Sequence, residues 1–259
     1  MVQKKKQLAH LFDATQCISC GACILACSQT NFPEMHNKSI PGRNWPASNI
    51  RIFRSEERSP VNLLVQCQQC ENAPCVKTCP FGANYYDENG LVRNDPDKCV
   101  GCNYCIASCP YDARWSHPIT GLPMKCISPG CMEMIKEGKQ PACVQACPAE
   151  ARLFGDILDL QSEISQKIAS SRTELLMPNK GTKPNFFYSS ASSRSLGMDD
   201  CHIPLARRSL RHGIFPKLLD QTEELRLSSD GVRYSRNALS RQPFGPNAQS
   251  SVCRFQRIS

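Results

Sequence analysis

The distribution of cysteine constrains this chain more than any other feature. Eighteen cysteines occur in 259 residues, and sixteen of them fall into four groups of four between positions 17 and 147. Cys201 and Cys253 lie outside these groups. Repetition at short, fixed spacings indicates four similar local sites, so the fold has to gather sixteen thiol groups at a few positions.

The four groups differ in their internal spacing. Group one is Cys-x2-Cys-x2-Cys-x3-Cys, and group three has the same spacing followed by proline. Group two is Cys-x2-Cys-x4-Cys-x3-Cys-Pro, and group four is Cys-x4-Cys-x11-Cys-x3-Cys-Pro. In chain order the groups are Cys17, Cys20, Cys23 and Cys27; Cys67, Cys70, Cys75 and Cys79; Cys99, Cys102, Cys105 and Cys109; and Cys126, Cys131, Cys143 and Cys147.

These spacings are typical of iron–sulfur clusters. Three cysteines in one tight loop can surround a [4Fe–4S] cube, and the fourth thiolate must come from elsewhere. In two-cluster ferredoxins the last Cys of each run, before proline, binds the neighbouring cluster. Group three has this spacing completely, and group one has it with Ser28 in place of the proline. The cysteines therefore predict [4Fe–4S] clusters.

Zinc and disulfides are the alternatives. Cys-x2-Cys pairs also form tetrahedral zinc sites, but these usually combine two isolated pairs and leave three cysteines in seven residues unexplained. A disulfide framework needs an oxidising compartment. The basic start, residues 1–6, is followed by a stretch too short and too polar for a signal peptide. No apolar run reaches eighteen residues, so we expect no transmembrane span of its own.

Short elements are expected around the cysteines. An Asn-Gly pair at positions 89 and 90 lies between two β-prone stretches within residues 83–93, which indicates a hairpin. Short helical turns are expected at residues 18–26, 73–78, 106–108 and 144–146, and prolines should end the last three.

A different pattern follows the last group. Leu160, Ile164 and Ile168 recur every four residues, which predicts one amphipathic helix over residues 159–175. The turn-rich stretch 178–188 then ends in aromatic residues and would close the fold.

The composition changes after Tyr188. Residues 189–259 contain ten Arg and one Lys, whereas residues 1–188 contain eight Arg and twelve Lys. The formal net charge of +8 comes mainly from this tail, which has 11 basic and 6 acidic residues. We expect a disordered, Ser- and Arg-rich extension without an assigned function. A nucleic-acid module is the weaker alternative, because no recognised binding motif accompanies the charge.

With the four groups in place, the chain resembles the four-cluster iron–sulfur subunits of molybdopterin oxidoreductases. This family includes the dimethyl sulfoxide, tetrathionate, thiosulfate and polysulfide reductases and the related formate-dependent nitrite reductase subunit. The resemblance covers residues 8–188. It rests on CQQCENAPCVKTCP at 67–80, CVGCNYC at 99–105 with CPYDAR at 109–114, GKQPACVQACP at 138–148 and GTKPNFFY at 181–188.

The resemblance implies an α+β fold of two bacterial-ferredoxin-like units, one inserted in the other, with short hairpins and short helices. Groups one and four would form the outer unit, and groups two and three the inserted one. The implied boundaries are 8–65 and 110–158 for the outer unit, 66–109 for the inserted unit, 159–188 for a C-terminal helix and closing segment, and 189–259 for the tail.

The resemblance also implies which cysteines share a cluster. Four sets of ligands follow, named here A to D. Set A is Cys17, Cys20, Cys23 and Cys147; set B is Cys27, Cys126, Cys131 and Cys143; set C is Cys67, Cys70, Cys75 and Cys109; set D is Cys79, Cys99, Cys102 and Cys105. The first interval of group four is two residues longer than the family's usual Cys-x2-Cys, so its loop has to bulge.

The implied function is non-catalytic electron transfer. Single electrons would pass through four [4Fe–4S] clusters between a membrane subunit that reacts with quinone and a molybdopterin catalytic subunit, in anaerobic respiration. The chain would be membrane-associated through these partners, at the periplasmic face after co-export with a signal-bearing catalytic subunit or at the cytoplasmic face. The alternative is a free-standing polyferredoxin-type carrier or maturation protein. No catalytic residue and no nucleic-acid partner are expected.

A few other residues near the cysteines are candidates for tuning the clusters or shielding them. Lys77, Lys98, Arg114 and Lys125 adjoin the cysteine motifs and could offset cluster charge, with a solvated surface as the equal alternative. Large apolar side chains could shield a cluster or contact a partner, with core packing as the default. They are Trp45, Phe53, Phe81 and Trp115.

Overall fold

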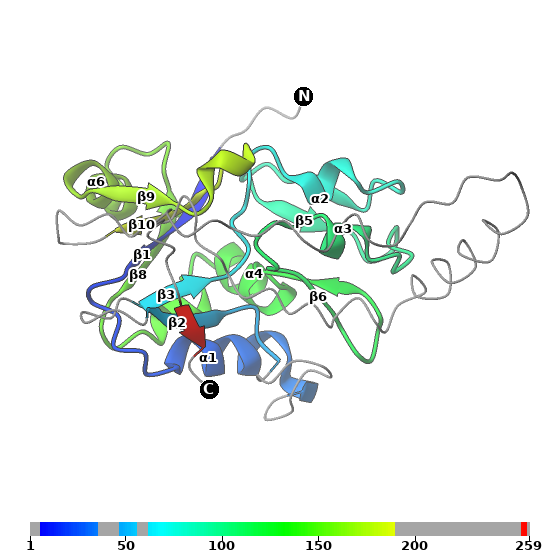
Figure 1. The fold of residues 1–259 in the computed structure, drawn as a ribbon, viewed down its shortest axis with the longest axis horizontal. Helices are drawn as coiled ribbons and strands as arrows, with labels where there is room; N and C mark the ends of the chain where they lie inside the picture. Colours follow the sequence, from blue (N-terminus) through cyan, green and yellow to red (C-terminus); the bar gives the residue numbers. More distant parts are fainter. Residues whose placement is uncertain (1–5, 36–46, 56–61, 190–254, 258–259) are drawn as a thin grey trace, which may run out of the picture.

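The computed structural model of the protein describes residues 6–35, 47–55, 62–189 and 255–257. Within these ranges the chain is a mixed α+β protein of small sheets and short helices (Figure 1). No helix in the described ranges has the length and apolar character needed to cross a lipid bilayer.

The described strands are β1 (Leu8–Asp13), β2 (Arg51–Ser55), β3 (Asn62–Val65), β4 (Asn84–Tyr86), β5 (Val92–Asn94), β6 (Trp115–Ser116), β7 (Pro123–Met124), β8 (Arg152–Asp156), β9 (Thr173–Leu175), β10 (Phe186–Ser189) and β11 (Phe255–Arg257). The helices are α1 (Ala22–Asn31), α2 (Pro74–Lys77), α3 (Tyr104–Ala107), α4 (Pro129–Lys136), α5 (Ala142–Gln145) and α6 (Glu163–Ser170). Two short 3₁₀ turns, η1 (Pro33–Met35) and η2 (Pro178–Lys180), complete them.

The largest sheet has the strand order β8-β1-β10-β9. Strand β1 runs antiparallel to β8 and parallel to β10, so two of the last strands flank the first one. All six residues of β1 are buried, because both faces of the strand are covered. Leu8 and Phe12 belong to the main core, whereas Ala9 and Leu11 pack with Ile164 of α6 in a smaller core.

Helix α6 is shorter than the sequence pattern predicts. The helix begins at Glu163, where the Ser162 hydroxyl caps it by accepting a hydrogen bond from the backbone N–H of Ser165 at 3.3 Å. Leu160 precedes the helix and is exposed, and residues 173–175 form β9 instead. The prediction of one helix over 159–175 is therefore wrong at both ends, because the cap and strand pairing with β10 limit it.

Five helices, α1 to α5, carry cysteines of the four groups. Helices α2, α3 and α5 each have four residues and end just before a Cys-Pro pair, as the sequence predicts. Helix α1 differs, because it runs for ten residues to Asn31 instead of ending at residue 26. The reason is Ser28, which stands where the other groups have a proline and lets the helix continue past Cys27.

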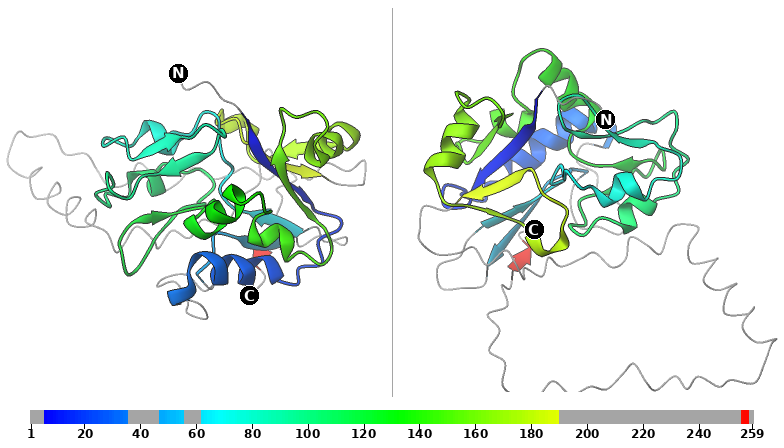
Figure 2. Two further views of the ribbon diagram at one scale, coloured as in Figure 1. Left: turned by 180° about the vertical axis from the view of Figure 1, so that it is seen from behind. Right: turned by 90° about the horizontal axis from the view of Figure 1, so that it is seen from above.

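The hairpin between groups two and three is confirmed. Strands β4 and β5 pair antiparallel, with Tyr85 opposite Arg93, and Gly90 adopts the left-handed conformation with φ 73°. A second small hairpin joins β6 to β7. Figures 1 and 2 show α2, α3 and the β4–β5 hairpin on the side of the molecule opposite α6.

A third sheet has the order β11-β2-β3. The short strand β11 lies antiparallel to β2, with Phe255 opposite Ser55 (Figure 1). Of the predicted tail, the structure describes Ser189, which ends β10, and the three residues of β11; the expectation of disorder for the remainder lies outside the described residues.

Candidate functional site

The sixteen cysteines of the four groups are free thiols, with none in a disulfide. Cys201 and Cys253 lie outside the described residues. The cysteines sit where short helices meet loops, and these loops use left-handed backbone at many positions. Examples are Ser19, Gly21, Gln69 and Gly101, whose φ angles are 58°, 75°, 46° and 70°. Such turns let a short segment curve around a compact group.

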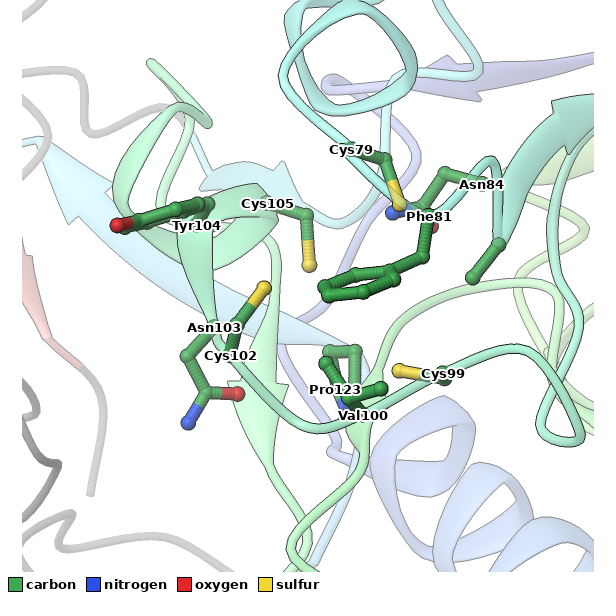
Figure 3. A pocket seen from close by; sticks show the side chains of 11 residues that line it. Cys79, Phe81, Asn84, Cys99, Val100, Cys102, Asn103, Tyr104, Cys105 and Pro123 are labelled. Carbon is green, nitrogen blue, oxygen red and sulfur yellow. The ribbon is translucent and has the colours of Figure 1, made fainter.

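The cysteines of set D line one open pocket. Figure 3 shows their four sulfur atoms turned toward the same space from the end of α2, from the loop before α3 and from α3 itself. Phe81, Val100 and Tyr104 line the same pocket, and all three are exposed. Four sulfur atoms around one hollow match the ligand demand of a [4Fe–4S] cube.

The cysteines of set A line a second pocket. It lies between the start of α1 and the turn that follows α5, with Phe12 and Leu64 on its inner side and Arg152 among its lining residues. Cys20 and Ile18 are exposed at its mouth. Sets A and D therefore both reach the protein surface.

Sets B and C are enclosed more deeply, and their members lie within electrostatic range of one another. Burial raises the pKa of Cys126 well above its usual value, and the thiolates of Cys143, Cys27 and Cys131 raise it further. Burial likewise raises the pKa of Cys70, and the thiolates of the other set C members raise it further. They are Cys67, Cys109 and Cys75.

Burial also keeps individual thiols protonated in the metal-free protein. It raises the pKa of Cys27 to about 11 and the pKa of Cys109 and Cys143 to about 12. Thiolate is the form that binds iron, so a bound cluster has to supply the free energy for deprotonation. Cluster binding to these sets is therefore coupled to the loss of thiol protons.

Backbone N–H groups point at the thiols from the loops. The N–H of Asn49 donates to Cys27 Sγ at 3.4 Å. The N–H groups of Asn84, Phe81 and Ala83 donate to Cys79; burial alone would raise the pKa of that thiol, but these bonds lower it. Amide dipoles of this kind compensate the negative charge of thiolates and sulfides.

The long loop of group four is held by α1 and by the segment before β2. Asn31 at the end of α1 accepts from the N–H of Cys131 at 3.0 Å and donates to Cys131 Sγ at 3.3 Å. Asn49 donates to the Ser128 hydroxyl at 2.7 Å. The longer interval thus runs through a bend at residues 126–127 into the start of α4, and Cys126 still lies within electrostatic range of the other set B cysteines.

Two of the four cations singled out in the sequence lie beside the cysteines. Arg114 is buried and its Nη2 donates to Cys75 Sγ at 3.3 Å. Lys125 is buried and its Nζ donates to the carbonyl groups of Val92 and Cys126. Lys77 and Lys98 are exposed, and Lys98 pairs with Asp95 at 3.3 Å.

The aromatic candidates divide in the same way. Phe53 and Trp115 are buried in the main core, where the Trp115 ring N–H donates to Asn49 at 2.9 Å. Phe81 instead is exposed beside set D. Trp45 lies outside the described residues.

Sequence reasoning missed Arg152 and His10. Arg152 is buried and the thiolates of sets A and B act on it. His10 lies with its Nε2 4.0 Å from Cys126 Sγ, and burial followed by the charge of Arg152 holds its pKa well below the usual value. The sequence does contain a signal for Arg152, because Arg114 and Arg152 each stand five residues after the last cysteine of a group.

The closing segment also supports a cysteine loop. Thr182 is buried, hydrogen-bonds the Tyr111 hydroxyl and donates to Cys70. The carbonyl groups of Thr182 and Lys183 accept from the N–H groups of Asn72 and Glu71 at 3.0 and 2.8 Å. Residues far along the chain thus hold the loop of group two.

Comparison with known proteins agrees with this geometry. Residues 16–83 and residues 62–157 each match a family model described as a 4Fe-4S dicluster domain. Protein NrfC of Escherichia coli K12 is 40% identical over 183 residues, which cover 68% of this chain and 77% of that protein.

Two further relatives come from reductases. One chain of the polysulfide reductase of Wolinella succinogenes is 38% identical over 187 residues, or 70% of this chain and 93% of that protein. One subunit of the tetrathionate reductase of Salmonella typhimurium is 34% identical over 211 residues, or 79% of this chain and 78% of that protein.

Proposed function

This protein belongs to the family of 4Fe-4S dicluster proteins that form the iron–sulfur subunits of reductase complexes, and we propose that it links a molybdopterin catalytic subunit to a quinone-reactive membrane subunit. It is a non-catalytic electron-transfer subunit with four [4Fe–4S] clusters, two for each dicluster domain. When bound, the clusters accept and release electrons one at a time.

We propose that sets A to D are the ligands of these four clusters. The observation that carries the proposal is a series of electrostatic interactions that connects the thiolates of each set to those of the next. Arg152 is acted on by sets A and B, Cys126 of set B by Cys67 of set C, and Arg114 by set C and by Cys105 of set D. This supports a row of clusters in the order A, B, C, D, with the two surface-reaching sets at its ends.

In this relay the protein's own residues position the clusters and set their surroundings, and they take no part in bond making. The loops fix the thiolates, the backbone N–H groups offset their charge, and the main core excludes water from sets B and C. The row of clusters reaches the surface at both ends, at sets A and D, so electrons can enter or leave at two places. Ile18 adjoins set A, and Val100 and Tyr104 adjoin set D.

We also propose the nested domain arrangement, with residues 66–109 inserted between 8–65 and 110–158. Its support is the pairing of β1 with β8 and the packing of α1 against α5 in the outer part. In the inserted part, α2 packs against α3 beside the β4–β5 hairpin. Residues 159–188 then close the large sheet of the outer unit through β9 and β10.

The proposed site of action is a membrane surface reached through partners. Either face fits the proposal: the periplasmic face, after co-export with a signal-bearing catalytic subunit, or the cytoplasmic face. Electron exchange between a quinone-reactive membrane subunit and the catalytic subunit would place the chain in anaerobic respiration.

Metal analysis of the anaerobically purified full-length chain tests the cluster proposal. We expect about sixteen iron and sixteen acid-labile sulfide per chain, with EPR signals of reduced [4Fe–4S] clusters. Stoichiometric zinc without an EPR signal would refute it. Substituting one cysteine of a single set, for example Cys102→Ser in set D or Cys20→Ser in set A, should alter the cluster of that set. The other three clusters should remain unchanged.

Affinity purification from the native host under anaerobic conditions tests the place in a complex. A large molybdenum-containing chain and a membrane subunit should accompany the tagged protein in constant proportion. A protein that runs alone while it still reduces or oxidises several oxidoreductases would instead be the free-standing carrier.

A further inference from the structure

One short turn occurs three times beside the cysteines. After the last cysteine of groups two, three and four, the chain continues as Pro-x-x-Ala and then a polar residue. The three copies are CPFGAN at 79–84, CPYDAR at 109–114 and CPAEAR at 147–152. The last position is Asn84 in the first copy and arginine in the other two.

The three turns have the same backbone geometry. The N–H of the residue before the alanine donates to the cysteine carbonyl, at 3.3 Å for Gly82 and Asp112 and 3.2 Å for Glu150. These residues adopt left-handed backbone with φ of 63°, 46° and 50°. The turn therefore directs the polar side chain inward each time, and Asn84, Arg114 and Arg152 are 4%, 1% and 3% exposed.

Arg152 lies between sets A and B. It lines the pocket of set A, and its Nη2 donates to Gln66 Oε1 at 2.7 Å. Within the described part of the chain, its Nε and Nη1 atoms have no hydrogen-bond partner. Burial lowers the pKa of Arg152, but the thiolates of two set B and two set A cysteines raise it, and the net shift is upward; they are Cys143, Cys23, Cys126 and Cys147.

Arg114 occupies the corresponding place between sets C and D. Its Nη2 donates to Cys75 Sγ of set C at 3.3 Å. Burial lowers the pKa of Arg114, but neighbouring thiolates outweigh that effect and the net shift is again upward. They are Cys75, Cys105, Cys67 and Cys109, of which Cys105 belongs to set D.

A buried charge of this kind differs from the surface cations. Its field is weakly screened, because protein and not water separates it from the thiolates. Lys98, next to Cys99, is 64% exposed in its side chain and shares its charge with Asp95. Arg51 is buried, but its guanidinium pairs with the Asp112 carboxylate at 3.0 Å.

We propose that Arg152 and Arg114 are positioning residues that each hold one positive charge between two clusters and thereby raise the reduction potentials of both: A and B for Arg152, C and D for Arg114. The proposal rests on the ligand sets proposed above. A reduced cluster carries one more negative charge than an oxidised one, so a fixed cation nearby stabilises the reduced form.

Redox titration of the anaerobically purified full-length chain, followed by EPR, tests this. In Arg152→Gln we expect two of the four midpoint potentials to fall and two to stay. A tenfold loss in the equilibrium constant for reduction corresponds to about 59 mV for one electron. In Arg114→Gln the other two should fall. Lys98→Gln removes one positive charge at the surface and should leave all four in place.

The conservative variants separate charge from packing. Arg152→Lys and Arg114→Lys keep the positive charge, so they should restore the potentials that the glutamine variants lose. Unchanged midpoints in Arg152→Gln at full iron content would overturn the inference, as would the same two clusters shifting in both glutamine variants.

Iron content keeps the outcomes distinct. A wild-type chain without clusters refutes the proposed function, and this inference falls with it, whereas unchanged potentials in a cluster-loaded Arg152→Gln refute this inference alone. If Arg152→Gln loses iron, Arg152→Lys decides: full iron with wild-type potentials supports the role of the charge, and equal loss of iron shows that Arg152 acts through its shape and hydrogen bond alone.

Discussion

At the scale of single residues, polar side chains between the loops connect cysteines that are far apart in the sequence. Asn31 is the clearest case. Its Nδ2 donates to the Cys27 carbonyl at 3.0 Å and to Cys131 Sγ at 3.3 Å, while its Oδ1 accepts from the Cys131 N–H at 3.0 Å. One amide thus joins a cysteine of α1 to a cysteine of α4.

Removing this amide should weaken set B. Asn31→Ala leaves the N–H of Cys131 without its partner, so we expect a loss of about 1–3 kcal/mol in stability. Anaerobic thermal unfolding of the cluster-loaded protein measures it as a lower Tm. Gln29→Ala, an exposed position on the same helix, is the control and should change the Tm little. Equal Tm values for both variants would contradict the role given to Asn31.

Gly130 shows how tightly the group-four loop approaches α1. A Cβ atom at this position would lie 2.1 Å from the backbone carbonyl oxygen of Thr30. Backbone cannot yield as a flexible side chain can, so Gly130→Ala has to displace the start of α4 or the end of α1. The glycine is therefore required by a close approach between two backbones.

We expect Gly130→Ala to lose one cluster. Iron should fall from about sixteen to about twelve per chain, because set B no longer closes. Iron and sulfide analysis measures this, and Glu133→Ala on the exposed side of α4 is the matched control. Retention of all iron with unchanged EPR signals in Gly130→Ala would show that the loop can yield.

At the scale of elements, the length of α1 follows from one substitution in the cysteine pattern. Ser28 replaces the proline that ends the other cysteine helices, and its carbonyl accepts from the N–H of Phe32 at 2.9 Å. The continued helix carries Asn31 to set B. A helix that ended at Cys27 could not make this contact.

Restoring the proline should therefore damage the site. Ser28→Pro places a residue without an N–H in the middle of α1, which costs about 3 kcal/mol or more. We expect a lower Tm and lower iron content. Ser28→Ala preserves the helix, and the Ser28 hydroxyl has no hydrogen-bond partner among the described residues, so this variant should behave as wild type. A proline variant with wild-type Tm would refute the explanation.

At the scale of the whole molecule, the closing segment joins the two ends of the fold. Strand β10 lies between β1 and β9, and the Tyr188 hydroxyl donates to the Leu64 carbonyl at 2.8 Å and accepts from Gln68 at 3.1 Å. Residues 182–183 meanwhile hold the loop of group two. The first strand, the group-two loop and residues 182–189 are thus one packing unit.

Truncation separates this segment from the tail. A chain that ends at Ser189 keeps all sixteen cysteines and β10, so it should retain about sixteen iron per chain. A chain that ends at Leu176 loses β10 and Thr182, and it should be insoluble or iron-poor. Comparable iron in the two chains, measured after anaerobic purification, would contradict the structural role of β10.

The clusters and the short elements around the cysteines could be predicted, because both depend on residues that lie near one another in the sequence. Three thiolates in one loop, a proline after the fourth and an Asn-Gly turn are all decided within about a dozen residues. The prediction of a helix over 159–175 was wrong because the end of this segment depends on a contact with a distant strand. Its apolar period was right at Ile164, but pairing with β10 turned residues 173–175 into a strand.

The sequence by itself determined, from four loops of cysteines, that the chain would carry iron–sulfur clusters, because ligand spacing is local chemistry. Only the tertiary structure decided which surroundings those loops receive. The burial of Arg114, Arg152 and Lys125, the exposure of Lys98, and the insertion of β10 beside β1 all arise from contacts between distant segments. Burial sets the strength of an electrostatic effect, and the extent of burial depends on which distant segments cover a residue.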